Sequence, residues 1–106
     1  MPQFNAGDTK TAIVTLDNPT VKEFTYDVVI YLDVTQVASS QLVSVTVPAG
    51  STGNVPLSVT MPIMEGVFPV FLDIYYGGAL LEHYQASEDV TLVIIPDVVI
   101  GPIVWQ

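Results

Sequence analysis

The feature of this sequence that most constrains its fold is a repeated alternation of apolar and polar residues. In one clear example, Val43, Val45 and Val47 alternate with Ser44 and Thr46. A period of two places successive side chains on opposite faces, which is typical of a β-strand with one buried face. Because the 3.6-residue period of an amphipathic helix is nearly absent, the chain is predicted to be all-β.

Turn signals separate these alternating runs about every 8–12 residues, the spacing typical of a β-sandwich. Gly77-Gly78 has the composition of a two-residue hairpin, and Pro56 predicts an edge strand because proline cannot donate to a ladder. We expect an antiparallel sandwich of about seven to eight strands in residues 1–95, with residues 96–106 as a further C-terminal strand. The strands expected before Pro96 are 11–16, 24–33, 43–47, 55–61, 68–75, 80–85 and 90–94.

The composition excludes several classes of function. The 106 residues include 11 acidic ones against two lysines or arginines, which gives a net charge of -9 and argues against nucleic acid or an anionic membrane as a partner. There is no cysteine, so disulfides, thiol nucleophiles and cysteine-ligated metals are excluded. No apolar stretch is long and unbroken enough for membrane insertion. The few charged residues, 12% of the chain, favour an extracellular, cell-surface or virion-surface protein covered by uncharged polar side chains.

Short turn and core motifs give a family resemblance. They are Gly7-Asp8-Thr9, Asn18-Pro19, Tyr31-Leu32-Asp33, Pro48-Ala49-Gly50 and Gly66–Val70. With them the chain resembles the cell-adhesion-related domain of bacteria and archaea over roughly residues 6–95. The resemblance implies an immunoglobulin-like or fibronectin-III-like sandwich, a scaffold that hosts many functions.

One departure from this family concerns its opening strand, which begins Pro-Asp and continues with two apolar residues. No such sequence precedes Gly7, whereas Pro96-Asp97-Val98-Val99 matches it at the C-terminal end. The strand of residues 96–106 has three interpretations: it opens a following repeat, it folds back onto its own sandwich, or it enters the sheet of a neighbouring copy. In the last case the head-to-tail contact would build rings or filaments. The candidate interaction residues are Val98, Ile100, Ile103 and Trp105.

The sequence predicts no enzyme, no cofactor and no metal site. His83 is the single histidine and is interpreted as a surface residue on a strand, because zinc sites need several nitrogen or sulfur ligands. A nucleophile of the Gly-x-Ser-x-Gly type is missing. Calcium takes oxygen ligands, and Glu88-Asp89 is the best candidate centre for it, but the sequence has no calcium-binding loop motif.

Two aromatic residues remain as candidates for a binding face. Phe71 and Tyr75 share one phase of a predicted strand, with Asp73 between them. Exposed aromatics can stack on sugars or contact proteins, whereas buried ones form cross-strand pairs. We therefore expect a non-enzymatic structural or adhesion module that binds other copies of itself or neighbouring protein domains, as a repeat, a filament subunit or a virion component. The alternative is a carbohydrate-binding module that holds a glycan on the face of Phe71 and Tyr75.

Overall fold

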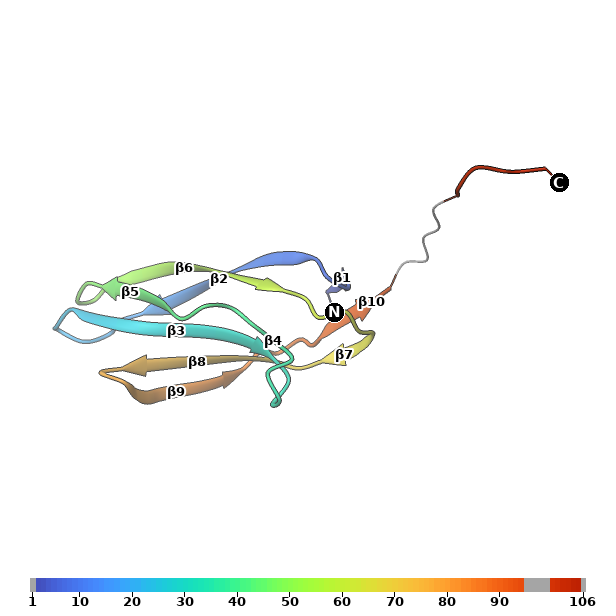
Figure 1. The fold of residues 1–106 in the computed structure, drawn as a ribbon. Helices are drawn as coiled ribbons and strands as arrows, with labels where there is room; N and C mark the ends of the chain where they lie inside the picture. Colours follow the sequence, from blue (N-terminus) through green and yellow to red (C-terminus); the bar gives the residue numbers. More distant parts are fainter. Residues whose placement is uncertain (1, 95–99, 106) are drawn as a thin grey trace.

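The computed structural model describes residues 2–94 and 100–105, and every regular element within them is a β-strand (Figure 1). In this part of the chain no helix has the length and apolar character needed to cross a membrane. Residues 95–99, which include the whole Pro96-Asp97-Val98-Val99 motif of the predicted C-terminal strand, lie outside the described residues. The strands are β1 Gln3–Asn5, β2 Thr9–Asp17, β3 Phe24–Leu32, β4 Ala38–Ser39, β5 Val43–Val47, β6 Thr52–Thr60, β7 Gly66–Phe68, β8 Val70–Tyr76, β9 Ala79–Gln85 and β10 Val90–Val93.

The strands form two facing layers of unequal width. In the wider layer β3 pairs with β8 on one side and with β4 and β5 on the other, and β9 follows β8 at the edge. The narrower layer consists of β2 and β6, paired antiparallel over their whole length from Thr9↔Thr60 to Asp17↔Thr52. All pairs in these two layers are antiparallel, which confirms the predicted all-β antiparallel sandwich.

A third, small sheet closes one end of the sandwich. There β10 pairs antiparallel with β7 and parallel with β1, a strand that the alternation did not predict. Pro69 separates β7 from β8, and residues 86–89 separate β9 from β10. The N-terminus and the end of β10 therefore lie at the same end of the molecule (Figure 1).

The turn between β8 and β9 has the geometry that its sequence predicts. Gly77 and Gly78 have φ values of +60° and +83°, a left-handed conformation that a side chain makes costly. Two such residues match the twist of a two-residue hairpin. The hairpin places β9 beside β8 with a single register shift between Ile74 and Tyr75.

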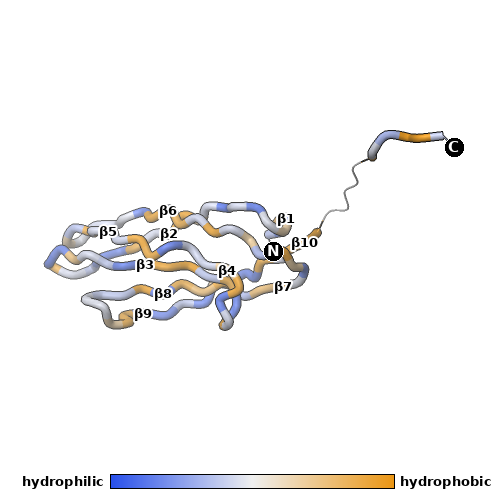
Figure 2. Tube along the Cα trace, viewed as in Figure 1, coloured by the Kyte–Doolittle hydropathy of each residue, from blue (hydrophilic) through white to orange (hydrophobic). Residues whose placement is uncertain are grey.

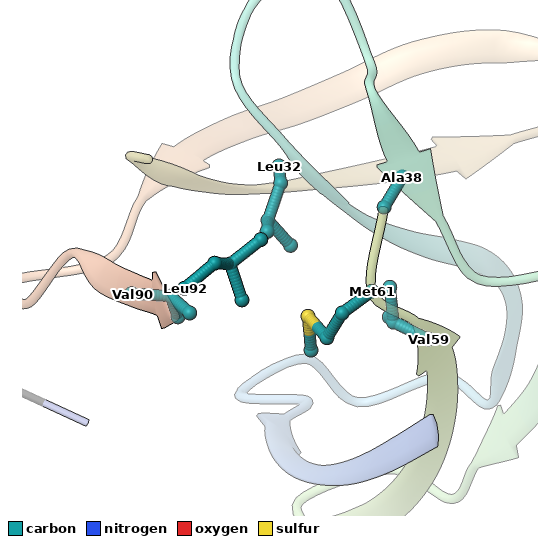
Figure 3. Packing of buried hydrophobic residues seen from close by; sticks show 6 residues of the cluster. All are labelled: Leu32, Ala38, Val59, Met61, Val90 and Leu92. Atoms are coloured by element: carbon teal, nitrogen blue, oxygen red, sulfur yellow. The ribbon is translucent and has the colours of Figure 1, made fainter. Parts of the chain in front are cut away.

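The core lies between the layers and consists of the inward rows of the alternating strands. Figure 2 shows apolar stretches along the strands and again in the C-terminal segment. One buried cluster sits at the end near β10 (Figure 3) and contains Leu32, Ala38, Val59, Met61, Val90 and Leu92. The other contains Leu16, Val28, Val47, Val55 and Leu57.

A buried asparagine fixes the turn after β2. Asn18 is fully buried, and its side-chain amide donates to the carbonyl oxygens of Lys22 at 2.9 Å and Val47 at 3.0 Å. Its Oδ1 accepts from the backbone N–H of Thr20 at 3.1 Å and from the Thr20 hydroxyl at 2.7 Å. The Asn18-Pro19 motif is therefore a hydrogen-bonded corner that ties the end of β2 to the end of β5.

Candidate functional site

The outer edge of β2 is an exposed row of backbone groups. Strand β2 pairs with β6 on one side, and within the described residues no strand pairs with it on the other. At the two ends of the ladder, Met61 N donates to Asp8 O at 2.7 Å and Asn18 N donates to Ser51 O at 2.9 Å. Both bonds continue the register of β2 and β6, so the even-numbered residues of β2 bond to β6. The odd-numbered residues direct their N–H and C=O groups to the free edge; they are Thr9, Thr11, Ile13, Thr15 and Asp17.

An apolar groove runs along this free edge, between β2 and β9. It consists of two adjoining hollows of about 360 and 500 Å³, which share Ala12, Ile30, Val70 and Ala86. Every residue of β9 is exposed, because β2 and β6 do not extend far enough to cover it. The larger hollow is lined further by Val14, Leu16, Leu72, Ile74, Glu82 and Tyr84.

The C-terminal segment carries the second exposed apolar surface. Residues 100–105 contain no strand and lie away from the sandwich (Figure 1). Trp105 is 90% exposed, and Ile100, Ile103 and Val104 are each more than three-quarters exposed. Contiguous apolar exposure of this kind is typical of interaction sites. The predicted interaction residues Ile100, Ile103 and Trp105 therefore share one exposed segment, whereas Val98 lies outside the described residues.

The other predicted face is more buried than the sequence suggested. Phe71 and Tyr75 do share the outer face of β8, but Phe71 is only 7% exposed and Tyr75 is half-buried. The ring of Phe71 lies 5.6 Å from that of Tyr31 and stacks on His83 at 5.3 Å. The strands that carry these neighbours flank β8, so Phe71 presents little of its ring to a ligand.

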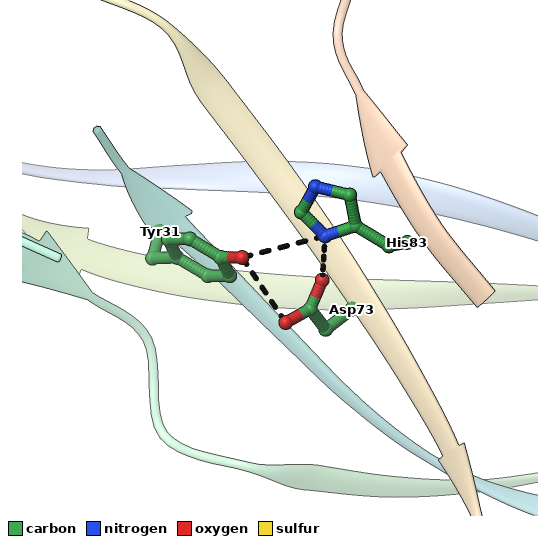
Figure 4. A network of polar contacts seen from close by, with 3 residues as sticks. All are labelled: Tyr31, Asp73 and His83. Atoms are coloured by element: carbon green, nitrogen blue, oxygen red, sulfur yellow. Dashed lines mark hydrogen bonds and ion pairs between the residues drawn. The ribbon is translucent and has the colours of Figure 1, made fainter. Parts of the chain in front are cut away.

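Beside Phe71 is a polar network that joins three strands. The hydroxyl of Tyr31 donates to Oδ2 of Asp73 at 3.1 Å and lies 3.5 Å from Nδ1 of His83, which also bonds to Oδ1 of Asp73 (Figure 4). Burial of the hydroxyl, followed by its bond to Asp73 and the negative charge of that residue, raises the pKa of Tyr31. The network ties β3, β8 and β9 together on the outer face of the wider layer.

The acidic residues do not gather into a metal centre in the part of the chain that the structure describes. Glu88 and Asp89, the candidate calcium ligands, lie between β9 and β10. Over residues 2–94 and 100–105, no three histidine or acidic side chains converge closely enough to hold a metal ion.

The sequence did not identify the groove as a site. In the strand expected over residues 11–16, Ala12, Val14 and Leu16 share one phase, and the structure places this phase inward. Whether a strand beyond β2 covers these side chains depends on pairing between distant strands. One signal was present: Leu80-Leu81 and Tyr84 put large apolar residues on both phases of β9, and all three are more than half exposed.

The comparison with solved structures gives matches at low sequence identity, among them the following two. The "ASH / PapD-like domain of human CEP192" aligns with a TM-score of 0.50 and 9% identity, over 90% of this chain and 82% of that domain. WR4, an MSP family member of C. elegans, aligns with a TM-score of 0.44 and 9% identity, over 89% of this chain and 93% of that one. No protein-family model matches the chain, and no curated protein matches its sequence. The first likeness identifies the fold as an immunoglobulin-like β-sandwich.

Proposed function

We propose that this chain is a non-enzymatic structural module that joins copies of itself end to end, by adding its C-terminal segment to the sheet of the next copy. The observation that carries the proposal is the exposed apolar segment of residues 100–105, with Trp105 at 90% exposure. Large aromatic and aliphatic side chains dominate the energetics of protein interfaces. A segment of this composition gains stability when a second surface covers it.

The position of the segment supports a contact between copies. Residues 100–105 lie beyond the end of the sandwich at which β10 ends, away from both layers (Figure 1). A contact between the tail of one copy and the body of the next is heterologous, so it repeats into filaments or rings. The net charge of -9 opposes non-specific association, so only a specific contact holds the copies together.

The biological setting follows from composition and motifs. The turn and core motifs shared with the cell-adhesion-related domain support a structural or adhesion role on this fold. The low share of charged residues, 12%, supports a place on a cell surface, in an extracellular repeat array or on a virion. In each setting the partners are other copies or neighbouring domains.

The test compares two variants that each put a carboxylate on an exposed apolar position. Trp105→Asp lies in the C-terminal segment, and Leu42→Asp lies between β4 and β5. We expect the unaltered chain to form oligomers whose mass rises with concentration in multi-angle light scattering, and elongated particles in electron microscopy. Trp105→Asp should weaken the association constant by about 30-fold or more, the effect of losing an interface residue worth about 2 kcal/mol. Leu42→Asp should leave it unchanged.

Thermal melts of both variants control for folding, since neither side chain is buried. A chain that stays monomeric at all concentrations would refute the proposal. Equal loss of association in both variants would also contradict it, because the contact would then not be specific to the C-terminal segment.

A further inference from the structure

We infer that the groove beside β2 receives the C-terminal segment of a second copy, and that the added strand runs antiparallel to β2. This inference rests on the proposed function and specifies its docking site. The narrower layer would then contain three strands, and the new one would cover the exposed inner side of β9.

The backbone of β2 offers the required hydrogen-bonding partners. Five odd-numbered residues from Thr9 to Asp17 direct their N–H and C=O groups to the free edge. This edge of nine residues spans about 30 Å, and the six residues 100–105 extend over about 20 Å, so the segment fits within it. Strand addition of this kind gains main-chain hydrogen bonds for affinity and side-chain pockets for specificity.

The other free edges are less suitable. Pro56 of β6 pairs with Ile13, an odd-numbered residue, so the backbone nitrogen of Pro56 faces the outer edge of β6. Because this nitrogen carries no hydrogen, that edge lacks one donor for an incoming strand. Strand β9 has an irregular register near Ile74 and Tyr75, and an incoming strand there would extend the wider layer without filling the groove. Among these three edges in the described part of the chain, that of β2 combines a regular nine-residue ladder with an apolar hollow beside it.

The side chains of the segment match the groove in type and spacing. Ile103 and Trp105 are two residues apart and share one face of an extended strand, while Val104 points to the opposite face. A bulge at Gly101-Pro102 would bring Ile100 onto the same face as Ile103. In the antiparallel orientation Trp105 reaches the hollow near the start of β2, which is lined by Phe4, Leu32, Met61 and Val90 among others. Ile103 then lies in the larger hollow against Leu72 and Tyr84.

The direction follows from where residues 100–105 lie relative to the sandwich. Strand β2 begins, and β10 ends, at the end of the molecule from which the segment extends (Figure 1). A second copy placed beyond that end in the same orientation presents the far end of its β2 first. A strand that enters there runs opposite to β2. To occupy its own groove, the segment would have to reverse directly after β10 and run parallel to β2.

Engineered disulfides test both the site and the direction, because the natural chain has no cysteine. One chain carries Val104→Cys alone. The second chain carries one of three substitutions, which are Thr11→Cys, Thr15→Cys and, as a control on the exposed face of β5, Thr46→Cys. Thr11 and Thr15 lie on the solvent face of β2, the face to which Val104 points in the added strand. Equal amounts are mixed under oxidising conditions and analysed on non-reducing gels. A chain with both Val104→Cys and Thr15→Cys, oxidised at high dilution, tests pairing within one molecule, because a segment in its own groove would run parallel to β2 and bring Val104 towards Thr15.

We expect Val104→Cys to cross-link to Thr11→Cys at least about tenfold more than to Thr15→Cys, and not to Thr46→Cys. Preference for Thr15→Cys would overturn the antiparallel direction, and an internal disulfide in the dilute double variant would overturn docking between copies. If the chains still associate through Trp105 but no residue of β2 cross-links, the inference fails while the proposed function stands. If the unaltered chain does not associate at all, the proposed function itself fails.

Discussion

The two edges of the narrower layer differ in what they offer to an incoming strand. Along β2 lies the apolar groove with Ala12, Val14 and Leu16 on its wall. Along the outer side of β6 lies a hollow of similar size, about 470 Å³, lined mainly by hydroxyl and amide side chains with Pro56 among them. An edge with proline and polar side chains resists strand addition, whereas a regular apolar edge promotes it. One layer of two strands therefore has one protected edge and one receptive edge.

The largest expected effect on stability and association comes from a proline introduced into β2, since Pro56 already occupies the outer edge of β6. Val14→Pro removes an N–H that bonds to β6 opposite Val55, and should lower the free energy of unfolding by about 3 kcal/mol or more. Ile13→Pro removes an N–H that faces the free edge, so the ladder to β6 keeps its bonds. We expect Ile13→Pro to fold within about 1 kcal/mol of the natural chain and to lose association.

Urea denaturation gives the stabilities of the two proline variants, and light scattering gives their association. If both variants were equally destabilised, the alternation of bonded and free residues along β2 would be wrong. If Ile13→Pro still associated normally, the receptive edge would lie elsewhere.

A second, smaller effect is expected at Asn18, the buried residue that ties the end of β2 to the end of β5. Asn18→Ala removes the side-chain donor to the buried carbonyl oxygen of Val47, whereas the carbonyl oxygen of Lys22 keeps the Thr20 hydroxyl as a donor. The free energy of unfolding should fall by about 1–3 kcal/mol in urea denaturation. Thr35→Ala, at an exposed hydroxyl in the turn between β3 and β4, is a matched control with a smaller expected change. An equal decrease in the free energy of unfolding in both variants would mean that the buried hydrogen bonds of Asn18 do not stabilise the fold.

The elements of the fold were predictable because they depend on local pattern. The alternation in Val43 to Val47 and the Gly77-Gly78 hairpin each determine a strand or a turn from adjacent residues. Pro56 correctly predicted an edge strand, since among the strands that the structure describes β6 pairs with β2 alone. By contrast, β1 has three residues and exists through its parallel pairing with β10, nearly 90 positions away, so no local period reveals it.

The site was less predictable because it depends on which distant strands are neighbours. Phe71 has the outward phase that its position predicts, yet Tyr31 and His83 cover it from the flanking strands. Ala12 and Val14 have the inward phase, yet they border an open groove because no strand of the described residues lies beyond β2 in its layer. The sequence predicts which face of a strand a side chain occupies, whereas the order of the strands decides whether a neighbouring element covers that side chain.

A third prediction concerns Glu82, an acidic side chain that lines the larger hollow and also a separate hollow of about 240 Å³ beside Asp17 and Leu81. Glu82 stands on the β9 wall, where an added strand would remove water from its carboxylate. Because loss of hydration disfavours a charge, Glu82→Gln should strengthen association by about 3- to 10-fold in sedimentation analysis. Glu23→Gln changes the net charge equally at an exposed turn and should have less effect. Equal gains in both variants would assign the effect to net charge rather than to the groove.

The smallest effect on stability is expected at Tyr31, which lies on the outer face of the wider layer, away from both edges of the narrower layer. Burial and Asp73 raise the pKa of Tyr31 in the folded chain, so the unfolded chain loses this phenolic proton first as the pH rises. The stability that Tyr31 contributes is therefore present below about pH 10 and decreases above it. Tyr31→Phe should cost about 1 kcal/mol at pH 7, the usual net value of one hydrogen bond, and this difference from the natural chain should shrink above pH 10 in urea denaturation. Association should not change, because the network lies on the far side of β8 from the groove; a Tyr31→Phe chain that no longer associated would show that the outer face takes part in the contact.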